Sequence, residues 1–297
     1  MSADSLGLLE PEFLARLQRL EIVAKKVVAG ELRGELRSRR RGVGSLFRDY
    51  KSYAQGDDLR FLDWNVYSRL GELLIKQFEA EENLDLLLVV DASGGMDFGD
   101  ANKFDHARRV AAALGFVALG KQASVRLAFA PRLAKDEAKT VYFGARQLQP
   151  FLQRLEDHPG AGEQADFFET FSAAVGRRKS RGLAIVLSDF MGAKGYEKGL
   201  KFLRHQGYRV GAIQVLDRRD LHPGLGGRLR LMDLESNRNA KGVVSKKILK
   251  AYEDEVRRWC ENVARYCRRQ GIDLVTLDTS LGLEASIREL LSGGLIE

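Results

Sequence analysis

The run Leu84-Asp85-Leu86-Leu87-Leu88-Val89-Val90-Asp91-Ala92-Ser93-Gly94-Gly95 decides the fold of this chain, because its apolar stretch ends in an acidic residue, a hydroxyl group and two glycines. A short apolar run of this kind predicts a buried strand that opens into a loop. In open α/β sheets, ligands collect at the carboxyl ends of the strands. Asp91 and Ser93 are therefore the first candidates for a functional site.

The chain from this run onward alternates between predicted strands and predicted helices. The strands cover residues 84–90, 124–130, 139–143, 183–188, 209–216 and 272–277, and the helices cover about 103–120, 145–156, 166–178, 196–206, 245–269 and 284–291. This alternation predicts an α/β fold with a doubly wound, mostly parallel sheet that carries helices on both faces. A polar, glycine-rich insertion at about 217–245 contains a small predicted hairpin at 229–234 and 242–244.

The residues ahead of the first strand form a separate part of the sequence. Apolar residues at helical spacing predict a helix at 12–28, and uneven alternation predicts short extended segments at 59–79. We therefore expect residues 1–82 to form an N-terminal helix and an irregular, extended segment that packs on a core of residues 83–297.

The composition is typical of a soluble globular protein. The 297 residues are 44% hydrophobic and 30% charged, with a formal net charge of +7. The N-terminus lacks the pattern of a secretory signal, and the best apolar candidate, residues 111–120, is too short to span a bilayer. We expect a cytoplasmic protein without membrane contact, in which Cys260 and Cys267 are thiols that do not pair with each other.

A second acidic residue closes another predicted strand. Asp189 follows the strand 183–188, so Asp91, Ser93 and Asp189 are expected at the same edge of the sheet. Oxygen ligands of this kind suit Mg²⁺. Two interpretations stay open, a functional magnesium site and a vestigial loop with structural carboxylates. A metal-dependent hydrolase that uses Asp91 and Asp189 is an alternative of another class.

This arrangement resembles the von Willebrand factor type A fold and its metal-ion-dependent adhesion site, whose first loop reads Asp-x-Ser-x-Ser. The resemblance implies the strand order 3-2-1-4-5-6 and metal ligands at Asp91, Ser93 and Asp189. Gly95 replaces the second serine, and Ala165 stands where the family uses a threonine. Two hydroxyl ligands are therefore missing, and the resemblance implies a degenerate site at which Mg²⁺ binds weakly or not at all.

A dense set of opposite charges and aromatic residues precedes the first strand. It includes the run Gly56-Asp57-Asp58-Leu59-Arg60-Phe61-Leu62-Asp63-Trp64, followed by Arg69. Such charges either form ion pairs within the chain or present a surface to a partner. We expect Trp64 to be buried, and the alternative is a surface anchor for a partner.

This segment closely resembles the signature of the bacterial family catalogued as domain of unknown function 58, in which it precedes a von Willebrand factor A-like domain. The resemblance runs from about residue 10 to the C-terminus. The residues that match the signature are Gly56, Asp57, Arg60, Asp63, Trp64 and Arg69.

Members of that family are often encoded beside MoxR-type AAA+ ATPases and are thought to work with them. The resemblance implies a non-enzymatic interaction or adaptor module that acts with such an ATPase, or with its client, in the assembly or activation of other proteins. Many relatives carry two N-terminal membrane helices, which are not found in this sequence, and this implies action in the cytosol. An alternative is nucleic-acid binding through the arginine-rich segment Arg33–Arg41, although acidic residues interrupt it.

Overall fold

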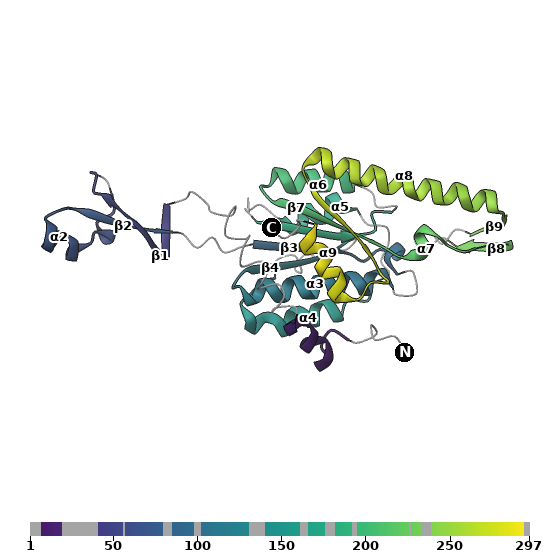
Figure 1. Cartoon of the computed structure of the whole chain (residues 1–297), viewed down its shortest axis with the longest axis horizontal. Helices are drawn as coiled ribbons and strands as arrows, with labels where there is room; N and C mark the ends of the chain where they lie inside the picture. The colour runs from purple at the N-terminus through teal and green to yellow at the C-terminus, as the bar shows by residue number, and fades with distance from the viewer. Residues whose placement is uncertain are drawn as a thin grey trace. The chain divides into compact units, whose positions relative to one another are not determined.

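The chain divides into two units in the computed structural model (Figure 1). The core unit comprises Met1–Gly30 and Leu84–Glu297, and the small unit comprises Glu31–Asn83. The structure describes residues 7–19, 41–55, 57–79, 85–97, 102–130, 140–160, 166–175, 182–191, 195–225, 227–232 and 239–293. Each unit is described by itself.

The core unit is built on a six-stranded sheet with the strand order β10-β7-β6-β3-β4-β5. Its strands are β3 (Asp85–Asp91), β4 (Ser124–Ala130), β5 (Val141–Phe143), β6 (Leu183–Ser188), β7 (Arg209–Leu216) and β10 (Asp273–Asp278). All neighbours are parallel except β5, which pairs antiparallel with β4. If the six strands of this sheet are numbered 1 to 6 in chain order, their spatial order from β5 to β10 is 3-2-1-4-5-6. The expected α/β topology is therefore confirmed.

The central strand β3 is apolar from Leu86 to Val90 because both faces of the sheet are covered. Leu86, Leu88 and Val90 contribute to one buried cluster, and Leu87 and Val89 contribute to the cluster on the opposite face. A parallel strand buried on both faces shows a continuous apolar run instead of alternation. This explains why residues 86–90 are apolar without interruption.

Helices cover both faces of the sheet (Figure 1). One layer contains α3 (Lys103–Gly120), α4 (Leu148–Glu156) and α9 (Leu283–Ser292), and the other contains α5 (Phe167–Val175), α6 (Tyr196–His205) and α8 (Lys246–Gln270). None of the helices in the described part of the chain is both long enough and apolar enough to span a membrane.

The N-terminal helix belongs to the core unit. Residues 11–19 are helical, and Phe13 and Leu17 are buried in the same cluster as α3 and α4. The sequence pattern predicts that these residues belong with the segment that ends at 82, whereas the contacts group them with residues 84–297. The remainder of the expected helix, residues 20–28, lies outside the described residues.

The insertion after β7 begins with the short helix α7 (Arg218–Leu221) and continues into a two-stranded hairpin. The hairpin pairs β8 (Gly227–Met232) antiparallel with β9 (Asn239–Val244). The core unit also contains two short 3₁₀ helices. They are η2 (Gly94–Met96), which follows β3, and η4 (Ala145–Gln147), which precedes α4. The predicted hairpin is present, and its strands begin two to three residues earlier than expected.

The small unit contains a β-ribbon and a helix. β1 (Arg41–Ser52) pairs antiparallel with β2 (Leu74–Glu79), and η1 (Leu59–Phe61) and α2 (Trp64–Leu70) lie between them in the chain. The extended structure predicted for residues 59–79 is therefore wrong for 59–61 and 64–70. A local cap explains the helix, because Asp63 accepts hydrogen bonds from the backbone N–H groups of Asn65 and Val66.

Candidate functional site

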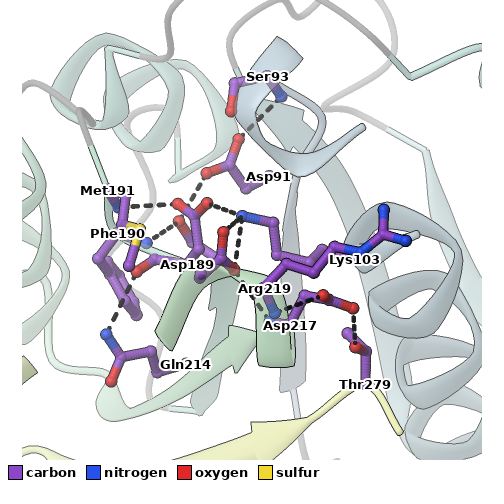
Figure 2. Close-up of polar contacts among 12 residues, drawn as sticks. Asp91, Ser93, Lys103, Asp189, Phe190, Met191, Gln214, Asp217, Arg219 and Thr279 are labelled. Carbon is purple, nitrogen blue, oxygen red and sulfur yellow. Dashed lines mark hydrogen bonds and ion pairs between the residues drawn. The ribbon is translucent and has the colours of Figure 1, made fainter. Parts of the chain in front are cut away.

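Asp91 ends β3 and is fixed by two neutral donors (Figure 2). Its Oδ1 accepts a hydrogen bond of 2.9 Å from the backbone N–H of Ser93. Its Oδ2 accepts a hydrogen bond of 2.6 Å from the hydroxyl of Ser188, the last residue of the neighbouring strand β6. Both oxygens of this carboxylate therefore face donors from the chain itself.

The Asp91 carboxyl group is fully enclosed. Only 1% of the residue is exposed. Burial, together with the nearby charge of Asp189, raises the pKa of Asp91 to about 6, although the hydrogen bonds from Ser188 and Ser93 oppose the rise. This carboxyl group titrates nearer to neutrality than an exposed aspartate does.

Asp189 lies directly after β6 and contacts a buried lysine. Its Oδ1 accepts a hydrogen bond of 2.7 Å from the backbone N–H of Met191. Its Oδ2 lies 2.6 Å from Nζ of Lys103, the first residue of α3. The side chains of Asp189 and Lys103 are each 2% exposed, so this ion pair lies within the protein.

Lys103 has a second acidic partner, Asp220 of α7. Its Nζ lies 3.1 Å from Oδ2 and 3.3 Å from Oδ1 of that carboxylate. Burial lowers the pKa of Lys103, but the charges of Asp189 and Asp220 outweigh this effect and raise it above its ordinary value. The same ammonium group offsets part of the rise that burial causes in the pKa of Asp189.

The segment around α7 is joined to the strand ends by further hydrogen bonds. Asp217 caps α7 by accepting from the backbone N–H of Arg219, and the carboxylate of Asp220 accepts from the backbone N–H of Asp217. The other oxygen of Asp217 accepts a hydrogen bond of 2.7 Å from the hydroxyl of Thr279, which directly follows β10. The start of the insertion is therefore tied to this edge of the sheet (Figure 2).

The structure places Asp91, Ser93 and Asp189 at the carboxyl end of the parallel strands, as the sequence predicts. Gly95 lies in the turn η2, and Ala165 lies outside the described residues. Lys103 and Asp220, which complete the cluster, are not predicted from the sequence. Their contact cannot be predicted from the sequence, because it depends on the topology that brings the start of a helix next to the insertion.

Protein donors already occupy part of the acceptor capacity of the carboxylates that a magnesium ion would use. Mg²⁺ requires a near-octahedral set of oxygen ligands at about 2.0–2.1 Å. All four carboxylate oxygens of Asp91 and Asp189 accept hydrogen bonds from protein donors. Within the described ranges, no group of three or more His, Cys, Asp or Glu side chains is placed to hold a metal ion. Magnesium binding stays a prediction from the sequence.

The signature residues of the small unit make ion pairs within the chain. Lys51 Nζ contacts both oxygens of Asp57, at 2.9 and 2.7 Å. Arg60 contacts Asp58 through two of its nitrogens, with the shortest distance 2.7 Å. These contacts favour the interpretation of the charges as intramolecular ion pairs.

Asp63 is the central signature residue, because it connects both strands of the small unit to α2. The hydroxyl of Tyr50 in β1 donates to its Oδ2 at 2.8 Å, and Lys76 Nζ in β2 lies 3.0 Å from the same oxygen. These contacts, with the helix cap, lower the pKa of Asp63 to about 2.

Trp64 is not buried as expected. It is 63% exposed at the start of α2 and makes an edge-to-face contact with Tyr67, with ring centroids 6.2 Å apart. Arg69 is exposed in the last turn of the same helix. Gly56 lies outside the described residues, as does the arginine-rich segment apart from Arg41, which begins β1.

Comparisons with known proteins identify relatives along most of the chain. The family model described as "Protein of unknown function DUF58" matches residues 49–275. Uncharacterized proteins of Mycobacterium tuberculosis (strain ATCC 25618 / H37Rv) and Mycobacterium bovis are each 31% identical over 283 residues, which cover 91% of this chain and 86% of each relative. Among solved structures, the conserved hypothetical protein BatB from Bacteroides thetaiotaomicron is similar, with 13% identity, a TM-score of 0.38, and coverage of 71% of this chain and 98% of that one. Since the family model spans more than half of the sequence, the chain belongs to the DUF58 family of proteins of unknown function.

Proposed function

We propose that this protein is a non-enzymatic interaction module that acts in the cytoplasm with a MoxR-type AAA+ ATPase, and that α2 of the small unit contributes the contact surface. The choice of partner comes from the resemblance of the signature segment to a family whose members are often encoded beside such ATPases. The choice of surface comes from the exposed apolar side chains around Trp64.

The exposed apolar surface of the small unit carries this proposal. Trp64, Tyr67 and Leu70 are spaced three residues apart on α2 and lie near one another along the helix. They are exposed by 63%, 43% and 69%, and Leu59 and Leu73 flank the helix with exposed side chains. Exposed clusters of this kind, and tryptophan and tyrosine in particular, mark protein-binding surfaces.

The helix that presents Trp64 is held in place by polar contacts of the buried Asp63 side chain. Asp63, of which only 5% is exposed, caps α2 and binds Tyr50 and Lys76 on the two strands. A helix fixed in this way loses little conformational freedom when a partner binds it. The charged residues of the signature thus hold α2 in place. The exposed tryptophan of the signature is the side chain that contacts the partner in this proposal.

The strand-end cluster supports a non-enzymatic role. Asp91 and Asp189 are each 1% exposed. Their carboxylate oxygens accept hydrogen bonds from protein donors, which favours a structural role for both groups over a role as a base or nucleophile. No observation in the described part of the chain favours the alternative of a hydrolase.

The proposal is tested by binding of the purified protein to the MoxR-type ATPase of the same bacterium, with and without ATP, by isothermal titration calorimetry. We expect Trp64→Ala to weaken binding by at least about tenfold, as at an interface hot spot. The matched control is Phe143→Ala, which removes an aromatic side chain of 48% exposure from the edge strand β5 and should leave the affinity unchanged. The proposal fails if the wild type does not bind, or if Trp64→Ala binds as the wild type does.

A further inference from the structure

Lys103 is a buried cation in a position that two physical effects disfavour. It is 2% exposed and ranks among the largest fully buried side chains. It is also the first residue of α3, where the helix dipole repels positive charge. A lysine persists at such a place only when acidic groups compensate both the burial and the dipole.

The compensating groups come from two other segments of the core unit. Asp189 follows β6 and lies 2.6 Å from the ammonium, and Asp220 in α7 lies 3.1 Å from it. Asp189 and Asp220 are 86 and 117 residues from Lys103 along the chain. A single positive charge thus joins the start of a helix, the end of a strand and the start of the insertion (Figure 2).

This arrangement supplies the cross-link that a metal ion would otherwise supply. A divalent cation at the strand ends gathers carboxylates from separate loops by satisfying their charge. Here the ammonium of Lys103 does so for Asp189 and Asp220, while Asp91 is satisfied by Ser93 and Ser188. A second, divalent charge next to the ammonium would be repelled by it.

We propose that Lys103 is the resident cation of the strand-end site, that its ammonium group replaces a divalent metal between Asp189 and Asp220, and that the native protein binds no Mg²⁺ or Mn²⁺ there. On this proposal, the degenerate adhesion-type site is a buried cluster of ion pairs that attaches the insertion to the sheet.

Removal of the ammonium opens this site to a metal ion. In Lys103→Ala, the two buried carboxylates of Asp189 and Asp220 lose the ammonium group that they share, and the volume of the lysine side chain becomes free. In Lys103→Met the charge is lost, but a side chain of similar length still fills the space. Only the alanine variant therefore offers both the negative charge and the room that a divalent cation needs.

The test is a titration of chelator-treated protein with Mn²⁺, followed by electron paramagnetic resonance of the free ion. We expect no specific binding to the wild type, and about one Mn²⁺ per chain, at least about tenfold tighter than any binding to the wild type, for Lys103→Ala. Lys103→Met should behave as the wild type, and Lys103→Ala combined with Asp189→Asn should lose the acquired ion.

Two results overturn the proposal. One is a wild-type protein that binds Mn²⁺ in a way that Asp189→Asn abolishes, and the other is a folded Lys103→Ala that acquires no ion. If Lys103→Ala fails to fold, the comparison of the wild type with Asp189→Asn still decides whether the native site holds a metal. All these measurements use the protein without a partner, so their outcome is distinct from that of the proposed ATPase binding.

Discussion

Nζ of Lys103 lies 2.6 Å from Oδ2 of Asp189, and both side chains are withdrawn from solvent. The two residues join the first turn of α3 to the end of β6. A buried ion pair of this kind contributes little net stability compared with an apolar pair of the same shape. Removal of only one of the two charged groups is costly, because the other charge then stays buried without its partner.

Lys103→Met should therefore destabilise the core unit by about 3–5 kcal/mol, since it leaves Asp189 and Asp220 without their shared ammonium. The measurement is urea unfolding followed by circular dichroism. The matched control is Lys121→Met, at the exposed C-terminal end of the same helix, with an expected change within about 0.5 kcal/mol. Equal effects of the two substitutions would contradict the role assigned to the buried pair.

Trp64→Ala should change the free energy of unfolding by less than about 1 kcal/mol, because the tryptophan is 63% exposed. A buried tryptophan would cost about 3–5 kcal/mol, which is what the sequence alone leads one to expect. Phe151→Ala, at a fully buried ring in α4, is the comparison and should show the large loss. Urea unfolding of the three proteins separates the two cases, and a large loss for Trp64→Ala would mean that its side chain is covered.

The sequence predicts the sheet well because local pattern and topology agree there. The run 86–90 is apolar without alternation, and a strand buried on both faces by helices requires this pattern. Asp91 and Asp189 could be placed at one edge because parallel strands bring their carboxyl ends together. Lys103 could not be placed there, since a lysine at the start of a helix is usually solvated, and its burial depends on two distant carboxylates.

The small unit was harder to predict because its structure depends on side-chain contacts. Residues 64–70 form a helix of only seven residues, too short to show a clear period. The helix begins at the cap supplied by Asp63 and ends at Gly71, which adopts a left-handed conformation with φ of 68°. The signature aspartate was recognised from the sequence, but its role as a cap was not.

The order of α2 should persist in acid to an unusually low pH. The pKa of Asp63 falls from an ordinary 3.8 to about 2 in the folded protein, chiefly through its contacts with Lys76 and Tyr50. A carboxyl group with a depressed pKa stabilises the fold fully above its unfolded value and loses that contribution as pH falls through the folded value. Between about pH 4 and pH 2, protonation of Asp63 should therefore progressively loosen α2.

The fluorescence of the adjacent Trp64 provides the readout, with Trp259→Phe used as the background to remove the second tryptophan. Asp63→Asn should abolish the transition below pH 4 and give the loosened state already at pH 7. Lys76→Met should move the transition to higher pH, because it removes the contact that most depresses the pKa. An unchanged transition in both variants would assign it to other carboxyl groups.

Cys267 should be almost unreactive in the folded protein. It lies on the buried face of α8, in the cluster that this helix forms with the sheet, and burial raises the pKa of its thiol to about 11. At pH 8 only about one thiol in a thousand is then ionised, and the thiolate is the nucleophile in alkylation. Cys260 is half-buried with a raised pKa, so it should react first with iodoacetamide, and both cysteines should react rapidly in guanidinium chloride. Mass spectrometry of timed samples gives the order, and rapid labelling of Cys267 in native protein would show that α8 does not stay packed on the sheet.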